Sequence, residues 1–164
     1  MTRVVCPGSF DPVTMGHLDI ITRASGLFDE VIALVIVNPA KEPSFTPQER
    51  VNMLEKSTAH LKNVSVDHHH GLLVDYIRDK GAIAIVKGLR AMSDFEYEFQ
   101  MALTNKKLLP QAETIFLTTT SEHFYLNSSL VKQVAGFGGD ISTFVPARVL
   151  SDIQLRLCDK YIKL

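Results

Sequence analysis

The sequence predicts an α/β fold in which a parallel sheet is covered by helices. Short apolar runs rich in β-branched residues recur along the chain, at residues 3–6, 31–37, 64–67, 82–86 and 114–119. Amphipathic helical patterns separate these runs, and such strand–helix alternation indicates parallel pairing. The runs are apolar on both faces, as is typical of central strands with helices on each side. We therefore predict a doubly wound, Rossmann-like parallel sheet of five strands with helices on both faces.

Two of the predicted helices carry clear start signals. Residues Thr46–Glu49 form a capping box, in which Pro47 occupies the first helical position. Residues Ser93–Glu96 have the pattern of a second box, which opens a helical run to Leu109. Pro110 is expected to end that helix.

The remaining punctuation fits the same alternation. Gly81 and Gly136 fall just past helical runs, where a left-handed residue is commonly needed. The three consecutive histidines, His68–His70, are predicted to form a polar loop, because no further metal ligands can be identified for them. Residues 146–162 are predicted to form a C-terminal helix.

Composition and charge exclude several classes of function. The chain has 164 residues, which corresponds to about one domain. Its net charge of -1 provides no global positive field for a nucleic acid or an anionic membrane. The longest uncharged apolar stretch, residues 31–40, is too short for a membrane helix, so we expect a cytoplasmic protein. Cys6 and Cys158 are expected to be buried thiols.

The loops after the predicted strands bring candidate binding residues to one edge of the sheet. Ser9 and His17 follow the first strand, Lys41 the second, and Lys87 and Arg90 the fourth. Because the carboxyl ends of parallel strands share an edge, these five side chains can converge. Taken singly, each cation also fits an ordinary solvated surface charge.

The helix that follows the first strand is a candidate phosphate site. With Thr14 as N-cap, His17 stands at the third helical position, beside backbone N–H groups that favour an anion. A capped helix with a surface histidine explains the same residues. Neither a dinucleotide-binding glycine motif nor a P-loop occurs in the chain, and no Ser-His-Asp or Cys-His arrangement can be defended. A hydroxyl-rich loop at residues 118–129 offers further donors.

Several motifs together resemble bacterial phosphopantetheine adenylyltransferase, over essentially the whole chain. They are Gly8-Ser9-Phe10-Asp11-Pro12, Thr14-Met15-Gly16-His17, Lys87-Gly88-Leu89-Arg90, Asp94-Phe95-Glu96-Tyr97-Glu98 and Asn127-Ser128-Ser129-Leu130-Val131-Lys132. The Thr-x-Gly-His element is shared by the wider nucleotidyltransferase superfamily, whereas the combination is highly specific. The resemblance implies a single nucleotidyltransferase domain over residues 1–164.

The resemblance implies transfer of AMP from ATP to 4′-phosphopantetheine, giving dephospho-coenzyme A and pyrophosphate. This is the penultimate step of coenzyme A synthesis. It further implies Mg²⁺ brought with ATP, a homohexamer, and coenzyme A as a feedback ligand. No metal-ligating residue is named, and whether the chain itself contributes to Mg²⁺ binding stays open.

The family's site residues carry over to matching positions here. His17, Lys41 and Arg90 would be catalytic, with His17 stabilising the transition state. The acceptor side would be bound by Ser9, Lys41, Leu73, Lys87 and Asn105. The ATP side would be bound by Ser9, Phe10, His17, Gly88, Leu89, Arg90, Glu98, His123, Phe124, Tyr125, Leu126, Asn127, Ser128 and Ser129.

Three positions depart from the family's usual pattern. Ser9 stands where threonine is frequent, which keeps the hydroxyl. Lys87 stands where arginine is frequent, which keeps the charge but loses the bidentate fork. Asn127 stands where serine is common, which keeps a hydrogen-bonding side chain.

Two other functions remain open from the sequence. One is another adenylyl- or cytidylyltransferase of the same superfamily with a different acceptor. The other is a nucleotide-binding module without catalysis, against which the joint presence of His17, Lys41 and Arg90 argues.

Overall fold

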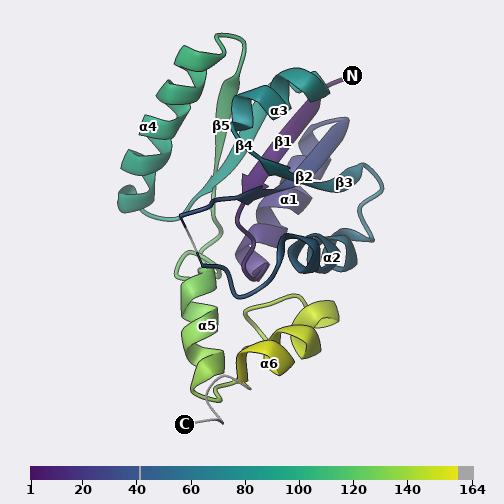
Figure 1. Ribbon diagram of the computed structural model, residues 1–164, viewed down its shortest axis with the longest axis vertical. Helices are drawn as coiled ribbons and strands as arrows, with labels where there is room; N and C mark the ends of the chain where they lie inside the picture. Colours follow the sequence, from purple (N-terminus) through teal and green to yellow (C-terminus); the bar gives the residue numbers. More distant parts are fainter. Residues whose placement is uncertain (41, 159–164) are drawn as a thin grey trace.

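The computed structural model describes residues 1–40 and 42–158, and in them the predicted five-stranded parallel sheet is confirmed (Figure 1). The strand order is β3-β2-β1-β4-β5, and every pair is parallel. The strands are β1 (Arg3–Gly8), β2 (Glu30–Val37), β3 (Val64–His70), β4 (Ala84–Leu89) and β5 (Glu113–Thr118). The helices are α1 (Met15–Leu27), α2 (Pro47–Thr58), α3 (Leu73–Lys80), α4 (Met92–Leu108), α5 (Ser128–Gly136), the 3₁₀ turn Ala147–Val149 and α6 (Leu150–Cys158).

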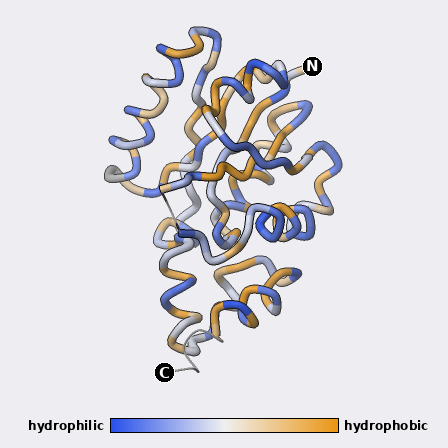
Figure 2. The backbone as a smooth tube through the Cα atoms, viewed as in Figure 1, coloured by the Kyte–Doolittle hydropathy of each residue, from blue (hydrophilic) through white to orange (hydrophobic). Residues whose placement is uncertain are grey.

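Alternate residues of the central strands point to opposite faces of the sheet and belong to two separate hydrophobic cores. In β1, Val4 and Cys6 face a large cluster that also takes in side chains of α1, α2, α5 and α6. Val5 faces a smaller cluster on the opposite side, shared with α3 and with the residues just after α4. Both faces of the sheet are therefore covered, as the unbroken apolar runs predict. Figure 2 shows these runs as hydrophobic segments through the middle of the molecule.

The order in which strands are added to the sheet reverses at β1, so that β2 and β4 lie on opposite sides of it. The chain runs outward from β1 through β2 to β3, and α3 then carries it back to β4 on the other side of β1. β1 pairs with β2 along six residues, but with β4 only at Val4 and Val5. The two central strands therefore separate toward their carboxyl ends, which is where open α/β sheets bind ligands.

Some predicted boundaries are confirmed. Thr46 and Glu49 form the predicted capping box, with Pro47 opening α2. Gly81 caps α3 in the left-handed conformation, with a φ of 62°. Cys6 is buried, whereas Cys158 is only half-buried. Within the part of the chain described, no helix is both long and apolar enough to cross a membrane.

Other boundaries were predicted wrongly, in each case because neighbouring elements decide them. His68–His70 are not a loop, because they pair with Val35–Val37 of β2 and extend β3. β4 continues beyond residue 86 to Leu89, because it pairs with β5 as far as Thr118.

The starts and ends of three helices also differ from the prediction. The N-cap of α4 is Ala91 rather than Ser93, and its carbonyl accepts from the N–H groups of Asp94 and Phe95. Gly136 is the last residue of α5, and the left-handed residue is Gly138. The predicted C-terminal helix is a 3₁₀ turn followed by α6, and residues 159–164 lie outside the described part.

A pair of glycine substitutions tests the close approach of α1 to β4. A Cβ added at Gly88 would stand 2.8 Å from Cγ1 of Ile20, whereas one added at Gly26 in α1 meets nothing within 4 Å. Gly88→Ala is expected to lower the free energy of unfolding by about 1–3 kcal/mol through overpacking. Gly26→Ala is expected to raise it by about 0.5–1 kcal/mol, because alanine favours the helix. Urea titrations measure both, and equal effects of the two changes would contradict this account.

Candidate active site

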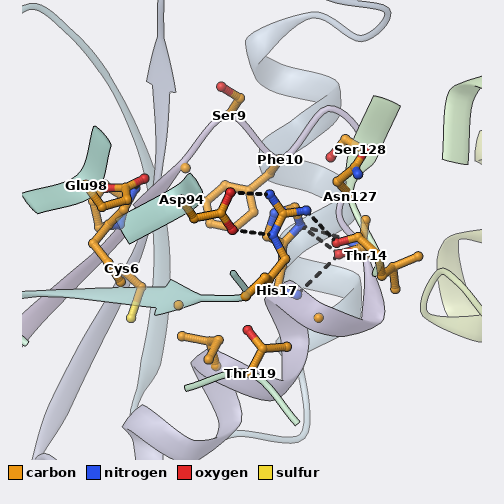
Figure 3. Close-up of a pocket in the computed structure, with 18 of the residues that line it drawn as sticks. Cys6, Ser9, Phe10, Thr14, His17, Asp94, Glu98, Thr119, Asn127 and Ser128 are labelled. Atoms are coloured by element: carbon orange, nitrogen blue, oxygen red, sulfur yellow. Dashed lines mark hydrogen bonds and ion pairs between the residues drawn. The ribbon is translucent and has the colours of Figure 1, made fainter. Parts of the chain in front are cut away.

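A cavity of about 490 Å³ lies beside the carboxyl ends of β1 and β4 (Figure 3). Its walls come from these two strand ends, the first turns of α1, α4 and α5, and the loop after β5. The lining residues are Cys6, Pro7, Gly8, Ser9, Phe10, Thr14, Gly16, His17, Ile20, Ile21, Val86, Lys87, Gly88, Arg90, Asp94, Tyr97, Glu98, Thr119, Leu126, Asn127, Ser128 and Ser129.

The turn after β1 is held in a tight conformation by Phe10. This residue has a φ of 48°, a left-handed conformation that non-glycine residues rarely adopt. Its buried ring packs edge-on against the imidazole of His17, with 5.0 Å between the ring centroids. A Cβ at position 8 would stand 3.0 Å from the Phe10 ring, so any larger residue there would have to displace that ring. Ser9 is thereby placed at the rim of the cavity.

Thr14 and His17 cap the start of α1 reciprocally. The Thr14 hydroxyl accepts from the His17 backbone N–H at 3.3 Å, and His17 Nδ1 accepts from the Thr14 N–H at 3.0 Å. The predicted N-cap and third-position residues are thus confirmed. In this box the imidazole occupies the place that a glutamate or glutamine usually fills.

The charge and tautomer of His17 follow from this environment. Burial, with a smaller contribution from the charges of Arg90 and Lys87, lowers the pKa of His17 to about 4. The imidazole is therefore neutral at pH 7. Because Nδ1 accepts a hydrogen bond from the backbone, we assign the ring proton to Nε2. His17 can donate one hydrogen bond from that atom.

A second helix begins at the opposite side of the cavity. Asn127 caps α5 by accepting from the Leu130 N–H at 2.8 Å, so asparagine performs here the role that a serine cap would have. The Ser128 hydroxyl donates to the Pro12 carbonyl at 2.8 Å and ties α5 to the turn before α1. Both helices direct the positive end of their dipoles toward the space between them, which favours a bound anion.

Among the residues that the structure describes, two cations line the cavity, and each is held by an acidic residue of α4. Arg90 pairs with Asp94 through two contacts, at 2.9 and 3.2 Å, and also donates to the Leu126 carbonyl at 2.9 Å. Lys87 Nζ lies 3.1 Å from a carboxylate oxygen of Glu98. These ion pairs orient the cations while leaving them partly exposed to solvent.

Most of the predicted site residues are brought together in this cavity. Those that line it are Ser9, Phe10, His17, Lys87, Gly88, Arg90, Glu98, Leu126, Asn127, Ser128 and Ser129. The convergence expected from the shared strand edge is therefore confirmed for Ser9, His17, Lys87 and Arg90. Lys41 lies outside the described residues.

Six predicted residues do not line the cavity. Leu73 packs against the smaller core, and Asn105 is buried on α4. Leu89 ends β4, where its carbonyl accepts from the Thr119 N–H. The segment His123–Tyr125 belongs to the loop after β5, which passes close to Gly16 at the start of α1.

The sequence reasoning named Glu98 of α4 but missed Asp94 and Tyr97. Asp94 and Tyr97 line the cavity together with Glu98, and Asp94 orients Arg90. Their positions carry a signal, because residues 94, 97 and 98 recur at helical spacings of three and four and so share one face of α4.

The arrangement suits a phosphorylated ligand. The cavity combines two helix N-termini, hydroxyl groups, a neutral imidazole N–H and two cations. Among the described residues, no group of three or more His, Cys, Asp or Glu side chains could hold a metal ion.

Comparison with known proteins places the chain in a family. Residues 5–134 match the model of the cytidylyltransferase-like family. The phosphopantetheine adenylyltransferase of Heliobacterium modesticaldum is 53% identical over 161 residues, covering 98% of this chain and 94% of that protein. That of Alkaliphilus metalliredigens is 58% identical over 146 residues, covering 89% and 93%.

Solved structures support the fold. A bifunctional NMN adenylyltransferase/ADP ribose pyrophosphatase from Francisella tularensis aligns with a TM-score of 0.68 at 16% identity, over 99% of this chain and 50% of that one. A lipopolysaccharide core biosynthesis protein from Thermoplasma volcanium aligns with a TM-score of 0.56 at 21% identity, over 74% and 99%. Given the full-length identity to its relatives, the chain belongs to the phosphopantetheine adenylyltransferases of the cytidylyltransferase-like family.

Proposed function

We propose that this protein transfers AMP from ATP to 4′-phosphopantetheine, giving dephospho-coenzyme A and pyrophosphate, the penultimate step of coenzyme A synthesis. The high identity to phosphopantetheine adenylyltransferases supports the substrates. The structural observation that carries the proposal is a neutral imidazole N–H at a helix N-terminus, inside a cavity that also holds Ser9, Lys87 and Arg90.

The reaction is a direct in-line displacement. A phosphate oxygen of the acceptor attacks the α-phosphorus of ATP, a new P–O–P linkage forms, and the bond to the pyrophosphate oxygen breaks. The acceptor phosphate is already an anion at neutral pH, so the step needs neither a general base nor a covalent intermediate. The protein contributes positioning and stabilisation of charge.

His17 supplies the central hydrogen bond. Its Nε2–H donates to an oxygen of the α-phosphate, on which negative charge builds in the transition state. A neutral donor keeps this interaction available throughout the physiological pH range. The helix dipole of α1 adds to the same stabilisation.

The remaining residues divide between the two substrates. Ser9, Lys41, Lys87, Leu73 and Asn105 serve the acceptor, whose phosphate Ser9 binds. Lys41 and Arg90 offset the repulsion between two polyanions. The ATP side consists of Ser9, Phe10, His17, Gly88, Leu89, Arg90, Glu98 and residues 123–129, where the N-terminus of α5 faces the phosphates.

Magnesium enters with the nucleotide. The described residues form no metal-binding cluster, and the acids that line the cavity are paired with Arg90 and Lys87. Mg²⁺ characteristically keeps several water ligands and binds substrate phosphates. We propose that the ion is held mostly by ATP phosphates and water, with little help from the described residues.

We further propose a cytoplasmic homohexamer, built as one nucleotidyltransferase domain per chain, with coenzyme A as a feedback ligand. One structural observation supports an assembly. Helix α4 exposes several large apolar side chains, namely Tyr97, Phe99, Met101, Leu103 and Leu108. Large exposed apolar patches mark interaction surfaces.

Pyrophosphate release tests the reaction and its main residue together. With ATP and Mg²⁺, release is expected only when 4′-phosphopantetheine is present. His17→Ala is expected to lower kcat by about 100- to 1,000-fold, because it removes a transition-state donor. ATP affinity should stay within a few-fold. His60→Ala, in an exposed turn after α2, is the matched control and should leave kcat unchanged.

Each alternative outcome has a distinct meaning. Release with another phosphorylated acceptor would assign a different transferase activity. Tight ATP binding without release on any acceptor would indicate a non-catalytic nucleotide-binding module. Normal turnover of His17→Ala would contradict the mechanism.

The neutral state of His17 has a consequence for stability. Its pKa in the folded protein is about 4, below the ordinary value of 6.5, so the unfolded chain binds the proton first as pH falls. The burial of a neutral His17 therefore stabilises the fold fully above pH 6.5, and this contribution is lost between pH 6.5 and 4. As the pH falls from 6.5 to 4, the wild type should therefore lose unfolding free energy relative to His17→Gln, which carries no group that titrates at this position. A constant difference in urea titrations would show that the pKa is not lowered.

A further inference from the structure

Beneath the turn that carries Ser9, three charged side chains form a cluster. Asp11 is only 7% exposed and Arg50 only 3% exposed. Lys132, on α5, completes the cluster with its ammonium group 2.7 Å from a carboxylate oxygen of Asp11. Buried charges are costly unless they are paired, so their retention here calls for an explanation.

Asp11 joins two loops and a helix. One oxygen of its carboxylate accepts from the Ser44 N–H at 3.0 Å and from Lys132, and the other accepts from the Phe45 N–H at 2.9 Å. The turn after β1 is therefore anchored both to the segment that leads into α2 and to α5. Charge-assisted bonds of this kind are about twice as strong as neutral ones.

Arg50, in the first turn of α2, binds the backbone of the same turn after β1. Its guanidinium donates to the Ser9 carbonyl at 2.9 Å and to the Thr46 carbonyl at 3.4 Å, which links the turn to the start of α2. The negative charge of Asp11 attracts it and offsets part of the cost of burial. A planar fork that reaches two carbonyls is a property of arginine that lysine does not share.

We propose that Asp11, Arg50 and Lys132 are positioning residues that set the place of Ser9 for the acceptor phosphate. The inference rests on the proposed function, in which Ser9 binds that phosphate. None of the three residues lines the cavity, whereas Ser9 and Phe10 do. Phe10 is held at a positive φ between Ser9 and Asp11, a conformation that persists only when its surroundings enforce it. The cluster supplies that constraint.

Displacement of a substrate-binding group by about 1 Å can cost on the order of 100-fold in rate. The effect of the cluster on catalysis passes through Ser9, and this gives it a signature. Weakening the cluster should lower kcat/KM for the acceptor only in a protein that still carries the Ser9 side chain. A residue that merely supports the fold would lower activity whether or not Ser9 is present.

A double-mutant cycle tests this signature. The variants are Arg50→Lys, Ser9→Ala and the two combined. Each is assayed for kcat/KM toward 4′-phosphopantetheine and for ATP affinity. Lys56→Met is the control. It removes an ion pair between α2, the helix that also carries Arg50, and Asp152 of α6, and neither partner lines the cavity. Circular dichroism and thermal unfolding check each fold.

The expected result is a loss of at least 10-fold in acceptor kcat/KM for Arg50→Lys and for Ser9→Ala, with ATP affinity within about 3-fold. The combined variant should be no more than about 3-fold worse than Ser9→Ala alone. The control should match wild type. Multiplication of the two single losses in the combined variant would overturn the proposal, as would an unchanged Arg50→Lys.

Two further arms keep the test decisive. Should Arg50→Lys fail to fold, Lys132→Met replaces it in the same cycle. This change removes the ion pair to Asp11, and because Lys132 is partly exposed the fold should tolerate it. A wild-type protein that releases no pyrophosphate with 4′-phosphopantetheine would refute the proposed function and the positioning role with it. A working wild type with additive variants would refute the positioning role alone.

Discussion

The reciprocal cap between Thr14 and His17 is the interaction on which the site depends. One pair of hydrogen bonds begins α1, turns the imidazole toward the cavity and leaves its proton on Nε2. Burial then keeps the ring neutral. A glutamate in the same cap would satisfy the backbone equally well, but it would place a negative charge in the cavity between the two helix N-termini. The side chain that caps α1 is therefore also the one that offers its N–H to the cavity.

The sequence predicts the fold and the centre of the site because both follow from short-range rules. The capping residues of α1 and α2 are spaced as local hydrogen bonding requires, and parallel strand ends share an edge, so Ser9, His17, Lys87 and Arg90 meet as expected. Where prediction failed, distant partners decided the outcome. The three histidines become strand because β2 pairs with them, although their composition suggests a loop.

The contacts that sequence alone could not supply are those between separate loops. Arg50 meets the Ser9 carbonyl across 41 residues of sequence, and Lys132 meets Asp11 across 121. No periodicity links such positions. Taken singly in the sequence, Asp11, Arg50 and Lys132 cannot be distinguished from ordinary charged residues of the surface. The cations of the cavity differ in this respect, since Asp94 and Glu98, which pair with Arg90 and Lys87, lie only four and eleven residues further along the chain.

The short pairing between β1 and β4 has a wider consequence. The cavity exists because two adjacent strands lose their hydrogen-bonded contact after Val5, so its presence is a property of the backbone. Side chains on its walls decide what is held there, but they do not create the opening. A scaffold of this kind can exchange one ligand for another through a few loop substitutions, without redesign of its core. Proteins of differently named activities share this architecture at 16% and 21% sequence identity.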